Sequence, residues 1–99
     1  MIYWILYDIS NSNQRNRIIQ ILKDYGLERR QKSAFIGDLL LANRKNLEEE
    51  LKQVFKSDKS KKNDSLFIIP VCTSCFQKTC TLGTDILSKE DFVSKTIII

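Results

Sequence analysis

Histidine is absent from this chain of 99 residues, and glycine and proline are scarce, at three and one residues. Without histidine, Ser-His-Asp and Cys-His nucleophile systems and the commonest general base are excluded. The three glycines lie far apart, so no glycine-rich loop cradles a phosphate. If the chain is an enzyme, a bound metal ion is the expected source of its catalytic power.

Long apolar runs are also missing. No run approaches the ~20 residues needed to cross a bilayer. The apolar start of the chain stops at Asp8 and has no basic leader, so a signal peptide is not expected. The three cysteines, at positions 72, 75 and 80, are odd in number and clustered, unlike a disulfide framework. These absences predict a cytoplasmic protein with no membrane partner.

The charge is moderately basic. Sixteen Lys and Arg against twelve Asp and Glu give a net charge of +4. A basic surface favours polyanions, because each cation set against a phosphate releases condensed counterions. Many small domains are as basic without binding nucleic acid, so charge alone leaves that question open. A single domain of this size hides only about 60–65% of its unfolded surface, and dimerisation would add burial.

Residues 2–7 are β-branched and aromatic without interruption, which predicts a central strand buried on both faces. Strand alternation places Asp8 on the same face as Leu6 and opposite Tyr7. The polar stretch 10–13 is rich in helix-capping residues. A helix is predicted next, because Ile18, Ile21, Leu22 and Tyr25 recur with helical spacing before Gly26.

The middle of the chain predicts two strands within residues 28–41, with a turn or bulge at Gly37-Asp38. A second helix follows from the spacing of Leu47, Leu51, Val54 and Phe55. Asn43 or Asn46 is expected to cap it. Residues 57–64 contain no apolar member and are predicted to form a mobile loop.

The last third of the chain predicts a strand over residues 66–72, where Pro70 should lie at an edge or bulge. A turn is expected at residues 82–85. The chain ends in an apolar strand, residues 96–99, which must pair within its own sheet or with a neighbour's. This ending is an argument for a dimer.

The order βαββαβ plus a terminal strand predicts an α+β, ferredoxin-like sandwich over residues 1–99, with two helices on one face of one sheet. If the terminal strand pairs with a neighbour's sheet, residues 81–99 lie at the dimer interface. A base-stacking RNA-recognition module is the nearest alternative on this fold. Residues 33–37 (Ser-Ala-Phe-Ile-Gly) lack its basic-glycine-aromatic motif, which disfavours that alternative.

Asp8 is the candidate metal ligand and catalytic residue, because it ends a central strand where a loop and a helix begin. Magnesium takes oxygen ligands and needs only one or two carboxylates. The alternative is an Asp that hydrogen-bonds the first turn of the following helix. Nearby basic residues could hold phosphate oxygens, although each alone is typically a surface charge: Arg15, Arg17, Arg29, Arg30 and Lys32.

The cysteines leave three alternatives. Cys72-x-x-Cys75 with Cys80 could supply three zinc ligands, but zinc usually takes four and no histidine is available. They could also be structural or incidental thiols, or a redox pair. One CxxC motif is a weak signal for any of these.

Taken in order, the residues resemble the Cas2 family of CRISPR-associated proteins, over nearly the whole chain. The resemblance is carried by Tyr7-Asp8-Ile9, Arg15 and Arg17, Tyr25-Gly26, residues 29–31, Ser33-Ala34-Phe35, residues 66–72 with Cys75, and Leu82-Gly83. Three departures are visible. Ala34 replaces a larger β-branched residue, the 57–64 loop is longer and more basic than typical, and Ile69-Pro70 replaces a Tyr-Pro pair.

The resemblance implies a two-fold homodimer in which the terminal strand joins the partner's sheet and two copies of Asp8 face each other, able to hold Mg²⁺. It also implies site roles for Tyr7, Arg15, Arg17, Arg29 and Phe35. Arg30 could substitute for Arg29, because a one-residue register slip exchanges their faces.

Two functions follow from the resemblance. One is a nucleic-acid-binding scaffold for the Cas integrase on duplex DNA in spacer acquisition, which we favour as the main role. The other is a Mg²⁺-dependent endonuclease on RNA or DNA, in which Asp8 holds the metal and arginines hold the strand. A toxin-like ribonuclease would share that chemistry in another biological setting.

Overall fold

The computed structural model describes residues 1–56 and 63–83. Its four strands form one antiparallel sheet in the order β2-β3-β1-β4. This order and the βαββαβ succession confirm the ferredoxin-like prediction. The elements are β1 (Ile2–Asp8), α1 (Ser12–Asp24), β2 (Glu28–Gln31), β3 (Ala34–Asp38), α2 (Leu41–Phe55), β4 (Ser65–Val71) and α3 (Thr73–Gln77). In the described part of the chain, no helix has the length and hydrophobicity to span a membrane.

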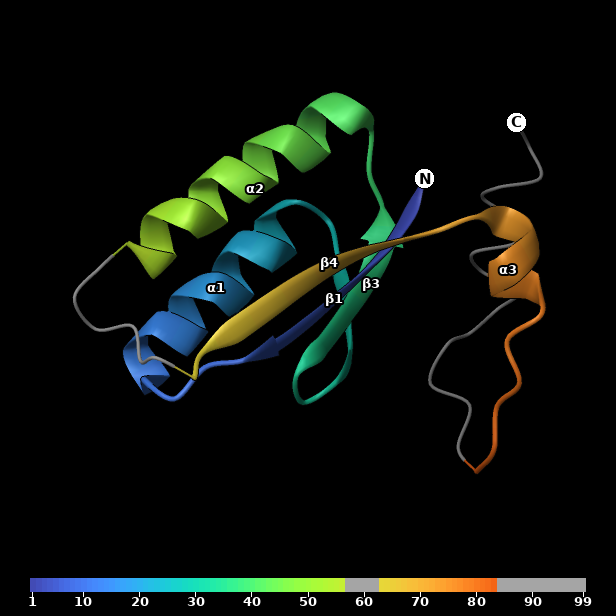
Figure 1. Ribbon diagram of the computed structural model, residues 1–99, viewed down its shortest axis with the longest axis horizontal. Helices are drawn as coiled ribbons and strands as arrows, with labels where there is room; N and C mark the ends of the chain where they lie inside the picture. Colours follow the sequence, from blue (N-terminus) through green and yellow to red (C-terminus); the bar gives the residue numbers. More distant parts are fainter. Residues whose placement is uncertain (57–62, 84–99) are drawn as a thin grey trace.

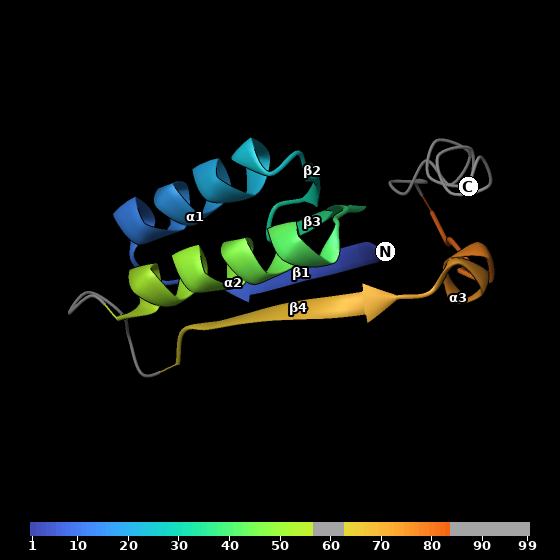
Figure 2. The ribbon, with the colours of Figure 1, turned by 90° about the horizontal axis from the view of Figure 1, so that it is seen from above.

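Helices α1 and α2 lie side by side on one face of the sheet, whereas α3 lies apart, beyond the end of β4 (Figures 1 and 2). The main core fills the layer between sheet and helices. Its strand residues include Tyr3, Ile5 and Tyr7, which alternate along β1 as strand geometry requires. The predicted alternation of β1 is therefore confirmed.

Helix α1 begins and ends where its sequence signals predict. The side chain of Asn11 accepts a hydrogen bond from the backbone N–H of Gln14, at 2.9 Å. At the other end, Gly26 has a φ of 83°, a left-handed conformation that glycine adopts without a steric penalty. The N–H of Gly26 donates to the carbonyl of Lys23, which closes the last turn.

The predicted cap of α2 is wrong. The helix begins at Leu41 after the extended residue Leu40, and no side chain of the described residues caps it. Asn43 and Asn46 therefore lie inside the helix. The apolar spacing locates the buried face from Leu47 onward but cannot locate the exposed first turn, because Leu40 and Leu41 face solvent.

The predicted turn at Gly37-Asp38 is also wrong. Both residues belong to β3, and Gly37 pairs with Tyr3 of β1. The chain reverses instead at Lys32-Ser33. Glycine is required at position 37 for another reason, because a Cβ there would lie 2.6 Å from Cδ2 of Leu27.

The second face of the sheet is only partly covered, so the prediction that β1 is buried on both faces is wrong. Phe76 of α3 packs over one end of this face, against Ile2 and Ile36. Farther along, Leu6 is 38% exposed and Phe67 is 59% exposed. We call the uncovered part the open face, which comprises Leu6, Asp8, Ser65, Phe67 and Ile69.

Strand β4 forms one edge of the described sheet, which confirms the edge position predicted for Pro70. The start of β4 is tied to the β1–α1 loop. Asp64 accepts hydrogen bonds from the backbone N–H and the hydroxyl of Ser10, at 3.0 and 2.9 Å. Most of the predicted 57–64 loop, the end of the 82–85 turn and the terminal strand 96–99 lie outside the described residues.

Candidate nucleic-acid interface

Asp8 ends β1 with an exposed side chain on the open face. It pairs across the ladder with Ser65 of β4. A hollow of about 300 Å³ lies at this point, lined by Leu6, Tyr7, Asp8, Ser33, Ser65 and Phe67. We call it the Asp8 hollow. It brings one carboxylate and two hydroxyl groups together beside exposed apolar side chains.

Asp8 does not cap the helix behind it. That role belongs to Asn11, three residues farther along the chain. The Asp8 carboxylate makes no hydrogen bond or ion pair with any residue that the structure describes. Because the Asp8 carboxylate has no such partner among the described residues, it is available to a ligand. The capping alternative is excluded for Asp8.

Tyr7 occupies the opposite face of the strand, in the helix-side core. Its ring lies beside that of Phe35, with centroids 6.2 Å apart, and Phe35 is completely buried. Burial raises the pKa of the Tyr7 hydroxyl, and the nearby guanidinium groups of Arg29 and Arg15 oppose this rise. Phe35 has no exposed surface within the single chain, so it can act on a site only through the side chains it packs against.

Two arginines of the predicted set bind backbone carbonyls close to Tyr7. Arg29 donates to the carbonyl of Lys32 at 2.8 Å, and Arg15 donates to the carbonyl of Ile9 at 2.9 Å. The Tyr7 hydroxyl donates to that same Lys32 carbonyl, at 2.9 Å. The Tyr7 bond ties the β2–β3 turn to β1, and the Arg15 bond ties α1 to the β1–α1 loop.

The structure gives Arg29 and Arg30 different surroundings. Arg29 pairs with Phe35 and so faces the helix side with Tyr7. A register irregularity follows it, and Arg30 forms an ion pair with Glu28 instead. Arg17 lies exposed on α1 and is the most solvent-accessible member of the predicted set on that helix.

The two faces are linked through one turn. Lys32, whose carbonyl accepts from both Tyr7 and Arg29, directly precedes Ser33, which lines the Asp8 hollow. Tyr7 and Arg29 therefore position one wall of the hollow from the helix side of the sheet. Sequence reasoning missed both Ser33 and Ser65. Ser33 lies in the β2–β3 turn and Ser65 begins β4, and only the pairing of the strands places them beside Asp8.

The donor set of the hollow is all oxygen, which suits a hard cation such as Mg²⁺. No group of three or more His, Cys, Asp or Glu side chains able to hold a metal occurs within residues 1–56 and 63–83. The same finding gives no support to the zinc alternative for the cysteines. Among the described residues that line the hollow, Asp8 is the one carboxylate.

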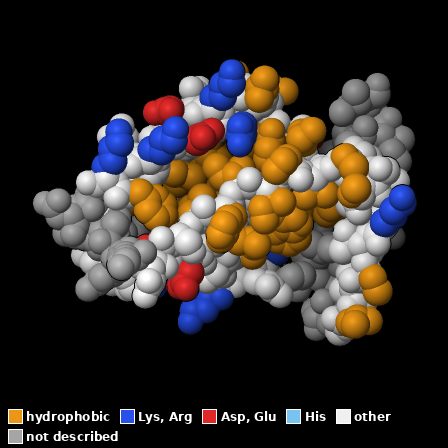
Figure 3. Space-filling view, in the orientation of Figure 1, with side chains coloured by type: hydrophobic (Ala, Val, Ile, Leu, Met, Phe, Trp, Pro, Cys, Tyr) orange, Lys and Arg blue, Asp and Glu red, His pale blue; other side chains and the backbone are white. Residues whose placement is uncertain are grey.

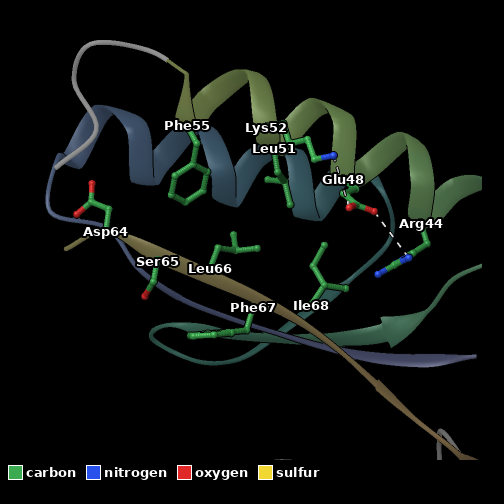
Figure 4. Close-up of a pocket in the computed structure, with 10 residues that line it drawn as sticks. All are labelled: Arg44, Glu48, Leu51, Lys52, Phe55, Asp64, Ser65, Leu66, Phe67 and Ile68. Atoms are coloured by element: carbon green, nitrogen blue, oxygen red, sulfur yellow. Dashed lines mark ion pairs between the residues drawn. The ribbon is translucent and has the colours of Figure 1, made fainter. Parts of the chain in front are cut away.

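A larger groove of about 490 Å³ runs between α2 and the edge strand β4 (Figure 4). Leu51 and Phe55 of α2 and Leu66 and Ile68 of β4 point into it, whereas Phe67 points away, toward the open face. Glu48 holds ion pairs with Arg44 and Lys52 along its rim, both at 3.7 Å. We call this the edge groove.

The surface around these features is apolar in the middle and carries both basic and acidic side chains at the margin. Figure 3 shows hydrophobic side chains gathered across the centre of the molecule, with Lys and Arg side chains along α2. An apolar patch with a charged margin is typical of a protein–protein interface.

The fold agrees with a family comparison. The family model described as CRISPR associated protein Cas2 matches residues 1–79. This chain belongs to the Cas2 family. The resemblance drawn from the sequence is thereby confirmed.

Individual Cas2 relatives support the assignment. The chain is 36% identical over 75 residues to the CRISPR-associated endoribonuclease Cas2 1 of Archaeoglobus fulgidus, covering 76% of each chain. It is 37% identical over 76 residues to a Cas1/Cas2 endonuclease fusion of Thermoproteus tenax, covering 67% of this chain and 29% of the fusion. The crystal structure of Streptococcus pyogenes Cas2 matches with a TM-score of 0.62 and 25% identity, over 84% of this chain and 100% of that chain.

Proposed function

We propose that the protein is the homodimeric Cas2 component of a CRISPR adaptation complex, binding duplex DNA and supporting the Cas integrase in spacer acquisition. The observation that carries the proposal is the exposed apolar open face beside Asp8. Leu6 and Phe67 are register partners on neighbouring strands, and Ile69 continues the patch along β4. Contiguous exposed apolar side chains mark a contact surface rather than a solvated one.

A second copy of the chain, related by a two-fold axis, is the simplest partner to cover that face. In an isologous interface each residue near the axis meets its own copy. If the axis passes near the Asp8 hollow, the two carboxylates come together and the apolar side chains around them are covered. The dimer would then bring two Asp8 carboxylates to one site.

The edge groove gives the dimer a second contact. Strand β4 offers an unpaired edge within the described sheet, and apolar side chains of β4 and α2 line the groove beside it. The sequence segment 96–99 (Thr-Ile-Ile-Ile) has the composition of a strand that needs such an edge. We place this segment of the partner along β4.

Duplex DNA and the integrase complete the assembly. The net charge of +4 per chain doubles in a dimer, which favours a polyanion. The Thermoproteus tenax relative carries Cas1 and Cas2 in one chain, which favours an integrase partner over a free-standing toxin-like ribonuclease.

The experiment that tests the proposal measures the affinity of the purified protein for labelled duplex DNA between low and moderate salt, with its mass in solution determined in parallel. We expect a dimer whose affinity falls steeply with salt. A monomer, or an affinity that is insensitive to salt, would overturn the proposal.

A second candidate function is favoured by the free carboxylate of Asp8, namely a Mg²⁺-dependent endonuclease. Asp8 from both copies, with the hydroxyls of Ser33 and Ser65 nearby, would hold the ion. When bound, Mg²⁺ would supply Lewis acidity toward a phosphodiester oxygen. Arg17 would hold the strand, while Arg15 and Arg29 keep the surrounding loops in place.

The endonuclease candidate is tested by incubating labelled single-stranded RNA and duplex DNA with the protein, in magnesium or in EDTA, beside the Asp8→Ala variant. Metal-dependent cleavage that is lost in the variant supports catalysis by Asp8. If neither protein cleaves and duplex binding is intact, the endonuclease candidate fails and the scaffold stands alone.

A further inference from the structure

The cysteine pair lies at the opposite end of the sheet from Asp8. Cys72 directly follows Val71, which pairs with Ile2 at the start of β1, whereas Asp8 pairs with Ser65 at the other end. At about 3.4 Å per residue, the length of β1 separates the two ends by roughly 20 Å. The proposed function therefore gives these thiols no role.

Helix α3 brings the two thiols together in its first turn. Cys72 caps the helix, and its Sγ accepts a hydrogen bond from the backbone N–H of Cys75 at 3.3 Å. The Cys72 Sγ also lies 3.4 Å from the hydroxyl of Ser74. Residues three apart in a helical turn are neighbours, close to the separation that a disulfide bridges.

The same contacts shift the pKa values of the two thiols in opposite directions. Hydrogen bonds from the Ser74 side chain and from Cys75 lower the pKa of Cys72 to about 7. In return, the hydrogen bond to Cys72 and the charge on it raise the pKa of Cys75. A thiolate nucleophile beside a thiol that stays protonated is the arrangement of reactive CxxC pairs.

The solvent exposure of this pair distinguishes it from cysteines that are buried in a core. All three cysteines are exposed, so none fills the core, and reagents in solution can reach them. The residue that anchors α3 is Phe76, which is 1% exposed against Ile2 and Ile36. The pair is therefore held at the surface on a docked helix.

We propose that Cys72 and Cys75 form a reversible dithiol–disulfide pair that exchanges with low-molecular-weight disulfides of the glutathione type. The Cys72 thiolate attacks one sulfur of the oxidant, forming a mixed disulfide and releasing one thiolate. Cys75 then loses its proton, and its sulfur attacks that of Cys72, releasing the second thiolate. The two cysteines are oxidised by two electrons, and the oxidant is reduced to two thiols.

The test treats the full-length protein with oxidised glutathione, blocks free thiols with iodoacetamide and maps the products by mass. Cleavage after Lys62 and Lys78 places Cys72 and Cys75 on one peptide and Cys80 on the next. We expect the first peptide to lose two hydrogens and escape alkylation, while Cys80 is alkylated. Dithiothreitol should reverse the change.

Two single substitutions complete the test. Cys80→Ser should still form the internal disulfide, and Cys72→Ser should not. A product that stops at a glutathione adduct on Cys72 would overturn the proposal. So would a disulfide that includes Cys80, or equimolar zinc protecting all three thiols from alkylation.

Alkylation kinetics give an independent readout. The rate for Cys72 in Cys75→Ser should rise with pH around a midpoint below that of an ordinary thiol, because Ser74 and the backbone N–H of residue 75 still contact its sulfur. At pH 7 it should exceed the rate for Cys75 in Cys72→Ser several-fold, because the larger thiolate fraction of Cys72 outweighs the lower nucleophilicity of its thiolate. Equal rates would contradict the assignment of Cys72 as the attacking thiol.

Discussion

Tyr7 and Asp8 are consecutive in the chain, yet their side chains leave the sheet on opposite faces. Tyr7 is 5% exposed and packs in the helix-side core, whereas Asp8 is exposed in the hollow of the open face. The Tyr7 hydroxyl reaches the Lys32 carbonyl, and the next residue, Ser33, lines that hollow. Asp8 therefore provides the exposed carboxylate of the hollow, and Tyr7, from the buried side, holds the turn that leads to Ser33.

The hydrogen bond of Tyr7 leads to the first prediction. Tyr7→Phe removes the donor to Lys32 and should lower the free energy of unfolding by about 1 kcal/mol, measured by urea denaturation. Amide exchange in the β2–β3 turn should become faster. Tyr25→Phe serves as the control, because Tyr25 is bonded to Glu50 near the surface. An equal loss in both variants would show that the Tyr7 hydroxyl has no special role in holding the turn.

The open face gives the second prediction. Phe67→Glu places a charge at a site that is 59% exposed in the single chain, so the fold should survive. The dimer should dissociate, because the charge would be buried without a partner at the interface. Sedimentation equilibrium measures the change in the dimer dissociation constant.

Leu41→Glu is the matched control, because Leu41 is similarly exposed, at 62%, but lies at the start of α2. This variant should remain dimeric. If both variants dissociate, or if neither does, the open face is not the dimer contact.

Arg17 gives the third prediction, on nucleic acid. Its side chain is exposed on α1, so Arg17→Ala should remove a charge without disturbing the fold. If each subunit makes one such phosphate contact, the slope of log affinity against log salt should fall by about 2 per dimer. Fluorescence anisotropy with duplex DNA measures the slope. Lys45→Ala, exposed on α2, should leave it unchanged, and a comparable fall there would remove the case for a specific site at Arg17.

The fourth prediction concerns Gly37, which lets β3 approach Leu27. Gly37→Ala should destabilise the protein by about 1–3 kcal/mol, because its Cβ would lie 2.6 Å from Cδ2 and 3.2 Å from Cα of Leu27. In a Leu27→Ala background, part of that cost should vanish, as a double-mutant cycle in urea can measure. Additive effects would show that the contact with the Leu27 side chain is not the cause.

Elements with strong periodicity or clear end signals could be predicted from the sequence. The alternation of β1 and the apolar spacing of α1 both extend over several repeats, and Asn11 and Gly26 mark the ends of α1. Helix α3 has five residues, too few to show a period, and was not predicted. Gly37 was misplaced because glycine serves both turns and close strand contacts, and only the position of Leu27 distinguishes them.

The candidate site was predictable only in part, for a related reason. Asp8 ends an apolar strand, which the sequence makes visible. Ser33 and Ser65 join it through strand pairing and turn position, which no local pattern encodes. The open face was taken for core because an apolar side chain such as Leu6 looks the same in sequence whether its own chain or a partner covers it.

The central claim is that two copies of the chain meet at the open face with their Asp8 residues together. The most direct test is Asp8→Cys in a chain whose three native cysteines are replaced by serine, treated with a short bis-maleimide, with Asp24→Cys on α1 as the control. We predict a covalent dimer from Asp8→Cys and none from Asp24→Cys. A dimer in solution that cross-links through Asp24→Cys but not through Asp8→Cys would contradict the account.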